Sequence, residues 1–214
     1  AAYPWITAAC AICKNFYKRF IAILPNIFTY RINSGTIQTV PTTVGNSITV
    51  PVNTTTVGTF TYTLLGVQDA SSTACTQSQT GSAVVTVNPL PTATISGTTA
   101  VCQNGAAPNI TFTGSGGTAP YTFTYRINSG SNLTATTSTG NSATVNVNTA
   151  TPGTFTYALV SVRDGSSTTC SQLQTGSAVV TVNPLPTATI SGTTAVCRDA
   201  ASPFITFTGS GGTA

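Results

Sequence analysis

The sequence predicts an all-β fold of tandem antiparallel sandwiches, and three observations lead to that prediction. Threonine, serine, glycine and asparagine supply nearly all the polarity, while only 5% of the residues are charged. This composition suits half-buried strands and tight turns better than helices. Several segments alternate apolar and polar residues, which is the period of a strand. Finally, residues 28–35 return as residues 123–130, which places the two copies 95 residues apart.

The length of the repeat determines the expected domain organisation. The offset holds without a gap from Pro25 against Pro120 to Pro89 against Pro184. Such a period is too long for a helical-hairpin or leucine-rich solenoid, and it matches the roughly 100 residues of an immunoglobulin-like sandwich. We therefore expect residues 25–88 to be the last two thirds of a unit, residues 89–183 to be complete, and residues 184–214 to be the first third of another.

The complete unit is expected to contain about seven strands. Alternation and turn residues predict them at residues 92–95, 109–113, 121–128, 133–137, 143–147, 154–163 and 177–182. The strand at residues 133–137 is short, as edge strands often are, and the alternation slips near Val160. The alternation predicts a core that contains Phe123, Tyr125, Phe155, Tyr157, Val180 and Val182.

Proline pairs mark the boundaries between units. They are Pro89 with Pro91 and Pro184 with Pro186. Proline fixes φ and lacks an amide donor, so these segments are expected to be stiff connectors and not parts of a central strand. The predicted protein is a semi-rigid string of domains.

Residues 1–24 have no counterpart elsewhere in the chain, although they hold both lysines and the only tryptophan. Three interpretations remain open: a remnant of an export signal, an assembly segment that substitutes for missing strands, or an artefact of the sequence. The apolar run is too short to span a membrane.

The complete unit holds one pair of cysteines, Cys102 and Cys170. A disulfide between them is the expected arrangement, and it favours an oxidising, extracellular setting. The alternative is a pair of buried thiols that never react, because cysteine number alone does not determine connectivity.

Cys75 and Cys197 each stand in an incomplete unit without their regular partner. One hypothesis joins Cys75 to Cys197 of another chain and so locks a head-to-tail polymer. The other joins Cys75 to Cys10 or Cys13 of the same chain. The spacing of Cys10 and Cys13 also fits a redox or metal motif, but there is no second pair and no histidine to support that interpretation.

The residue inventory argues against catalysis, and we expect no catalytic, cofactor-binding or metal-binding residues. The chain has no histidine, and its three acidic residues are all aspartates, of which Asp69 and Asp164 are repeat equivalents. The chain therefore lacks the residues for a catalytic acid–base pair and for a cluster of carboxylates that could bind a cation. Residues 114–119 match a dinucleotide-binding pattern, but a strand follows where a helix is required. Residues 25–214 are nearly neutral, which argues against nucleic-acid binding.

Residues 114–125, 153–157 and 162–166, together with Cys170, resemble the tandem extracellular repeats of Bacteroidota surface proteins, including gliding-motility adhesins. Those repeats are immunoglobulin-like or polycystic-kidney-disease-like sandwiches. The resemblance covers residues 25–214, and it implies export, surface display, and adhesion or fibre building without catalytic residues.

The expected function is a structural one: a stalk or filament subunit of a bacterial surface fibre or adhesin. Exposed strand edges in residues 184–214 invite pairing with another chain, so self-association by completing partial sandwiches is a hypothesis with a physical motive. The alternative is a carbohydrate- or protein-binding module with a glycan or surface ligand. We expect no membrane span.

Overall fold

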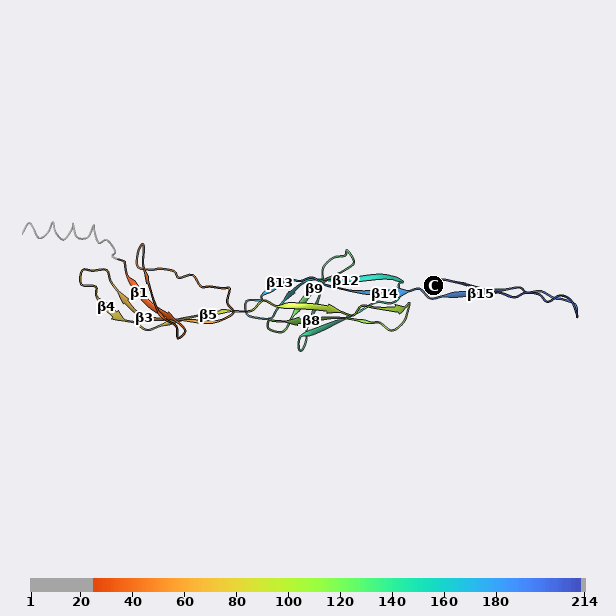
Figure 1. Ribbon diagram of the computed structural model, residues 1–214, viewed down its shortest axis with the longest axis horizontal. Helices are drawn as coiled ribbons and strands as arrows, with labels where there is room; N and C mark the ends of the chain where they lie inside the picture. Colours follow the sequence, from red (N-terminus) through yellow and green to blue (C-terminus); the bar gives the residue numbers. More distant parts are fainter. Residues whose placement is uncertain (1–24, 213–214) are drawn as a thin grey trace, which may run out of the picture. The chain divides into compact units, whose positions relative to one another are not determined.

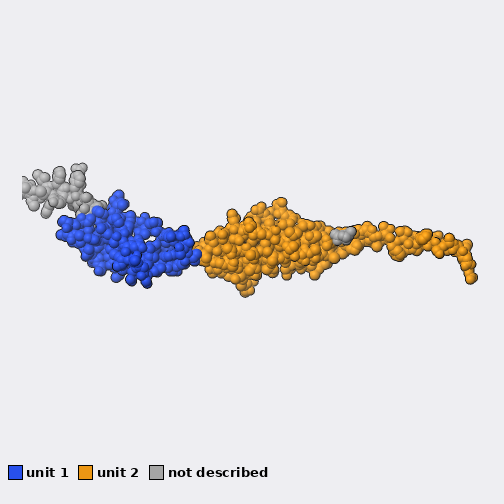
Figure 2. Space-filling model, in the orientation of Figure 1, with its two compact units in different colours: residues 1–87 blue, residues 88–214 orange. Residues whose placement is uncertain are grey.

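The computed structural model describes residues 25–212, and all regular secondary structure in that range is strand (Figure 1). The chain divides into two compact units, residues 1–87 and residues 88–214, called unit 1 and unit 2 below (Figure 2). Across residues 25–212, no helix is long and apolar enough to cross a membrane.

The described residues of unit 1 form one five-stranded antiparallel sheet. Its strands are β1 (Ile27–Ile32), β2 (Ile37–Pro41), β3 (Gly58–Gln68), β4 (Thr76–Ser78) and β5 (Ser82–Val87). The order is β2-β1-β3-β4, and β5 also pairs with β3. The β1–β2 hairpin turns at Asn33, whose φ of 51° suits asparagine better than most residues.

Unit 2 contains two sheets that enclose one core. The six-stranded sheet has β7 (Thr99–Cys102), β9 (Thr122–Ile127), β10 (Leu133–Thr136), β12 (Gly153–Arg163), β13 (Ser171–Leu173) and β14 (Ser177–Asn183). The three-stranded sheet has β6 (Thr92–Ser96), β8 (Asn109–Ser115) and β11 (Ser142–Asn146) in the order β11-β8-β6. Every pair is antiparallel except β14–β7, which is parallel.

The core of unit 2 lies between these two sheets. Ile110 and Phe112 of β8 are fully buried, and the Phe112 ring lies 5.6 Å from Phe123 and 4.9 Å from Tyr125, measured between centroids. The predicted core residues Phe123, Tyr125, Tyr157, Val180 and Val182 are all buried. Phe155 differs, because it is only partly buried and packs against the edge of the cluster.

Unit 2 ends in a two-stranded antiparallel ribbon, β15 (Thr187–Ser191) with β16 (Thr206–Ser210). The ribbon repeats the β6–β8 pairing in the same register, since Ile190 faces Phe207 as Ile95 faces Phe112. Every residue of both strands is exposed.

Two features of the predicted strand pattern are confirmed. Leu159 pairs with Tyr125 while Ser161 pairs with Thr124, so Val160 is the extra residue of a β-bulge. β10 lies at the edge of its sheet. The short strands β7 and β13 were not predicted, because neither is long enough to show alternation.

Candidate functional site

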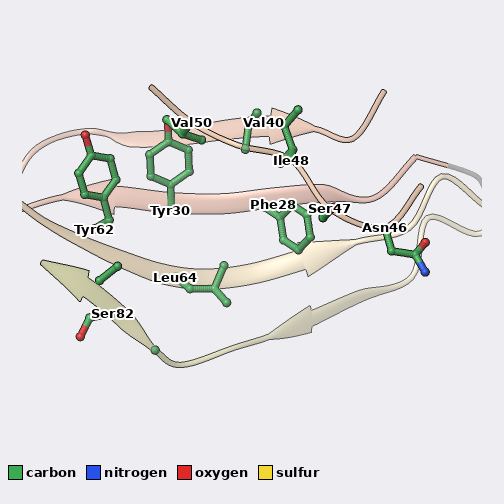
Figure 3. Close-up of a pocket in the computed structure, with 12 residues that line it drawn as sticks. Phe28, Tyr30, Val40, Asn46, Ser47, Ile48, Val50, Tyr62, Leu64 and Ser82 are labelled. Carbon is green, nitrogen blue, oxygen red and sulfur yellow. The ribbon is translucent and has the colours of Figure 1, made fainter. Parts of the chain in front are cut away.

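The sheet of unit 1 carries an open, apolar groove of about 500 Å³ on one face (Figure 3). Aromatic and aliphatic side chains of β1, β2 and β3 form its floor, and the segment 46–50 forms one wall. The lining residues are Phe28, Tyr30, Val40, Asn46, Ser47, Ile48, Val50, Tyr62, Leu64, Gly81, Ser82 and Ala83. Contiguous apolar surface of this kind marks interaction sites in soluble proteins.

This groove is the counterpart of the core-facing surface in unit 2. Tyr30 pairs with Leu64 across β1 and β3, as Tyr125 pairs with Leu159 across β9 and β12. The Tyr30 and Tyr62 rings stack at 6.2 Å and 22°, and the rings of their counterparts stack at 6.2 Å and 25°. The described part of unit 1 therefore forms this face without a covering sheet.

The two faces differ in what lies over them. In unit 2, Phe123, Tyr125, Tyr157 and Leu159 are buried beneath the three-stranded sheet. Every buried apolar side chain in the described part of the chain belongs to unit 2, from Ala93 to Val182. The equivalent side chains of unit 1 are only half-buried. The apolar face of unit 1 therefore retains surface that its counterpart has removed from water.

Among the described residues, two backbone edges of unit 1 also lack partners that unit 2 provides. Residues 142–146 form β11 because β8 hydrogen-bonds to them, whereas the equivalent residues 47–51 form no strand. The second edge is that of β5. Its counterpart β14 has β7 on its outer edge, whereas β5 pairs with β3 alone among the described strands. Unpaired edges are templates for strand addition.

The ribbon presents the complementary surface. Phe207 of β16 is 75% exposed, and Ile205, which directly precedes β16, is 53% exposed. Their counterparts in β8, Phe112 and Ile110, are both 0% exposed because they fill the core of unit 2. The side chains that cover the sheet in the complete unit are thus displayed uncovered in the ribbon.

The cysteines are where the structure departs most from the expected site. Cys75, Cys102, Cys170 and Cys197 are all free thiols. Cys102 lies beside Asn183, next to the start of β12, while the Cys170 carbonyl accepts the amide of Asp164, just after the end of β12. An 11-residue strand separates them, which is roughly 30 Å at the usual rise per residue.

A disulfide requires Cα atoms within about 7 Å. The expected bond between Cys102 and Cys170 is therefore wrong for this fold. The interchain bond between Cys75 and Cys197 stays a prediction, although the equivalent cysteines of unit 2, Cys170 and Cys102, lie at opposite ends of one domain. The alternative partners Cys10 and Cys13 lie outside the described residues.

Asp164 is the one buried acidic side chain in the described range, and it organises a loop. Its carboxylate accepts hydrogen bonds from the Thr118 amide at 3.2 Å and from the Ser166 hydroxyl at 2.8 Å. Burial alone would raise the pKa of Asp164, but these bonds, with those from the Ser166 and Cys170 amides, hold it below the ordinary value. Within residues 25–212, no three His, Cys, Asp or Glu side chains gather as a metal site.

The glycine-rich segment that matches a dinucleotide-binding pattern is a turn between β8 and β9. Gly116 has a φ of 80°, and the Tyr121 hydroxyl donates to the Gly117 carbonyl at 2.8 Å. A strand and not a helix follows, so no helix N-terminus is available to bind a phosphate.

No protein-family model matches the chain, and no curated protein does either. Among solved structures, the chain is similar to one described as a Ca²⁺-stabilised adhesin that helps an Antarctic bacterium reach out and bind ice. The identity is 20% and the TM-score is 0.40, over 80% of this chain and 44% of that one. The chain thus spans less than half of that structure's length, and a likeness of this size identifies neither a family nor an activity.

Proposed function

We propose that the chain is a non-enzymatic, extracellular structural protein: a repeat stalk or filament subunit of a bacterial surface fibre or adhesin. Its repeated element would be an immunoglobulin-like sandwich. The observation that carries the proposal is the recurrence of whole strands along the chain. β3 and β12 begin and end 95 residues apart, and so do β6 and β15. Repetition of one folded domain builds length, which is the property that a stalk needs.

The side chains available for chemistry support a structural role over a catalytic one. The chain has no histidine and no glutamate. The carboxylate of Asp164 already accepts hydrogen bonds within its loop, and Asp69 does the same with Ser71 and Cys75 in the equivalent loop. General acid–base catalysis needs positioned groups that exchange protons near neutral pH.

Self-association is the second part of the proposal. Unit 1 has an apolar face and, within residues 25–87, two strand edges without a partner, and the ribbon displays the side chains that cover such a face in unit 2. Completion of one partial sandwich by another, head to tail, would extend the array. Since the cysteines of one sandwich lie at opposite ends, the association would be non-covalent.

Surface display is tested on intact cells of the source organism. Antibodies against unit 2 should label the outside of the cells in immunogold microscopy, and external protease should remove the label. Negative staining of the released material should show strings of domains. Protein found only inside intact cells would overturn the proposal.

The competing function, a carbohydrate- or protein-binding module, has one specific observation in its favour. Phe28, Tyr30 and Tyr62 line the groove, and aromatic faces suit sugar stacking as well as apolar side chains. A glycan-array screen of the chain distinguishes the two. Binding that is lost in Tyr30→Ala would favour the glycan-binding module.

A further inference from the structure

We propose that the groove of unit 1 is an acceptor for the ribbon of a second copy of this chain. β16 of the second copy would lie antiparallel beside residues 47–51, and Phe207 and Ile205 would fill the groove. This inference rests on the proposed self-association and names its site, its partner segment and its register.

Unit 2 provides the template for the register. There, Phe112 faces Ala143 and Ile110 faces Val145 across β8 and β11. The same offset places Phe207 opposite Ile48 and Ile205 opposite Val50, both of which line the groove. The Phe207 ring would then meet Phe28 and Tyr30, as the Phe112 ring meets Phe123 and Tyr125.

Residues 1–24, which precede β1, do not carry the sequence of the missing strands. Residues 1–24 stand where residues 96–119 stand in the complete repeat. In the sequence alignment, Asn15 corresponds to the buried Ile110, and Arg19 corresponds to Gly114. A Cβ at Gly114 would already come within 2.6 Å of the Tyr121 ring. In this alignment, β16 keeps the sequence of the missing strand, whereas residues 1–24 do not.

One cross-strand pair differs between the template and the proposed interface in both members at once. At the end of the β8–β11 ladder, Asn109 faces Asn146. The corresponding pair in the proposed interface is Phe204 with Pro51, and both residues are apolar. A ribbon that displaced β8 from unit 2 would instead place Phe204 opposite Asn146. The matched change therefore favours pairing of the ribbon with unit 1.

The donor also supplies a strand for the second open edge. In unit 2, Val101 of β7 lies parallel beside Val182 of β14. The equivalent residues are Val196, which is exposed, and Val87 at the end of β5. Residues 194–197 of the second copy would pair with β5 in the same way. One donor segment thus satisfies both unpaired edges of unit 1.

The test uses one charged substitution on each partner in the full chain. Ala83 is exposed, but its counterpart Ala178 is fully buried under the covering sheet. Ala83→Glu therefore blocks the acceptor, and Phe207→Asp blocks the donor, at positions where the free chain tolerates a charge. The matched controls are Val84→Glu and Thr206→Asp, adjacent residues on the opposite face of the same strands.

Sedimentation velocity over a concentration series provides the measurement. We expect the unmodified chain to associate, and each blocked variant alone to associate about 100-fold more weakly or worse, because an unpaired carboxylate would be buried. An equimolar mixture of Ala83→Glu and Phe207→Asp should form dimers, since it contains one intact acceptor and one intact donor. Both controls should associate like the unmodified chain.

Three results would overturn the inference: an unmodified chain that stays monomeric, a Phe207→Asp variant that associates normally, or a mixture that does not form dimers. A monomeric chain that associates only after deletion of residues 1–24 would identify those residues as the occupant of the groove. Surface display of a chain that does not associate would leave the proposed stalk standing and remove only this assembly site.

Discussion

Residues 28–32 and 123–127 share the sequence Phe-Thr-Tyr-Arg-Ile, but Phe123 is fully buried and Phe28 is not. Both segments are strands, both pair with the same neighbours, and both face a bulge at the same place in the partner strand. The difference is the three-stranded sheet over β9, which has no counterpart in the described part of unit 1. Strand pairing within the sheet therefore does not depend on the covering three-stranded sheet, whereas burial of the phenylalanine side chain does.

The largest effect is expected from truncating a covered phenylalanine, Phe112, and its uncovered repeat equivalent, Phe207. Phe112→Ala should lower the free energy of unfolding of unit 2 by about 3–5 kcal/mol, since a fully buried ring is replaced by a cavity. Phe207→Ala should change it by less than about 0.5 kcal/mol in dilute, monomeric protein. Urea denaturation, with hydrogen-exchange mass spectrometry to assign each transition, measures both. Equal losses would show that the ribbon is covered in the free chain.

A methyl group added at two equivalent glycines distinguishes the core of unit 2 from the ribbon by steric fit. A Cβ at Gly114 would lie 2.6 Å from the Tyr121 ring, whereas a Cβ at Gly209 has nothing closer than the Thr187 carbonyl at 3.9 Å. Gly114→Ala should cost about 1–3 kcal/mol, and Gly209→Ala should be nearly neutral. Thermal unfolding of the two variants provides the measurement. A neutral Gly114→Ala would mean that the Tyr121 ring moves easily.

Among the described residues, the equivalent aspartates differ by one partner, because Asp164 accepts the amide of Thr118 from the segment before β9, whereas the described donors to Asp69 are Ser71 and Cys75. The folded-state pKa of Asp164 lies below its ordinary value. Its contribution to stability is therefore present above about pH 4, the unfolded range, and is lost as the pH falls through the folded pKa.

We expect Asp164→Asn to lower stability at pH 7 more than Asp69→Asn does, and to flatten the loss of stability in acid. Unfolding curves between pH 2 and pH 7 measure both effects, since the range of about 2–7 spans this titration. An unchanged acid dependence in Asp164→Asn would mean that other groups carry it.

The hairpin turns should show the smallest difference, because they are the same in both units. Asn33 and Asn128 have φ of 51° and 54°, and their side chains accept the amides of Thr61 and Thr156. Alanine at either site should cost about 1 kcal/mol from its left-handed backbone. Hydrogen exchange at the Thr61 and Thr156 amides should accelerate by similar factors. A much larger effect in one unit would contradict independent formation of the sheets.

The sequence allowed the all-β class, the main strands and the bulge at Val160 to be predicted, since alternation along one strand is a local property. It did not reveal β7, because four residues show too little alternation and their parallel partner, β14, lies far along the chain. The groove itself, with residues 47–51 left without a strand partner, emerged only from the packing.

The cysteines show a second limit of prediction from the sequence, because here the expected contact is absent from the fold. Two cysteines per repeat made Cys102 and Cys170 the natural pair, but spacing along the chain carries no information about which end of a sandwich each residue reaches. β7 carries Cys102 to one end, and the loop after β12 carries Cys170 to the other.

By itself, the sequence determined where strands form, which side chains share a face, and where the pattern repeats. Only the tertiary structure decided which of those faces are covered. The segment Thr-Phe-Thr-Gly-Ser occurs at residues 111–115 and again at residues 206–210, with its phenylalanine 0% exposed in one copy and 75% exposed in the other. The physical reason is that a strand presents its apolar face through local geometry, whereas burial requires a second sheet about 10 Å away, made of residues distant in the chain or in another molecule.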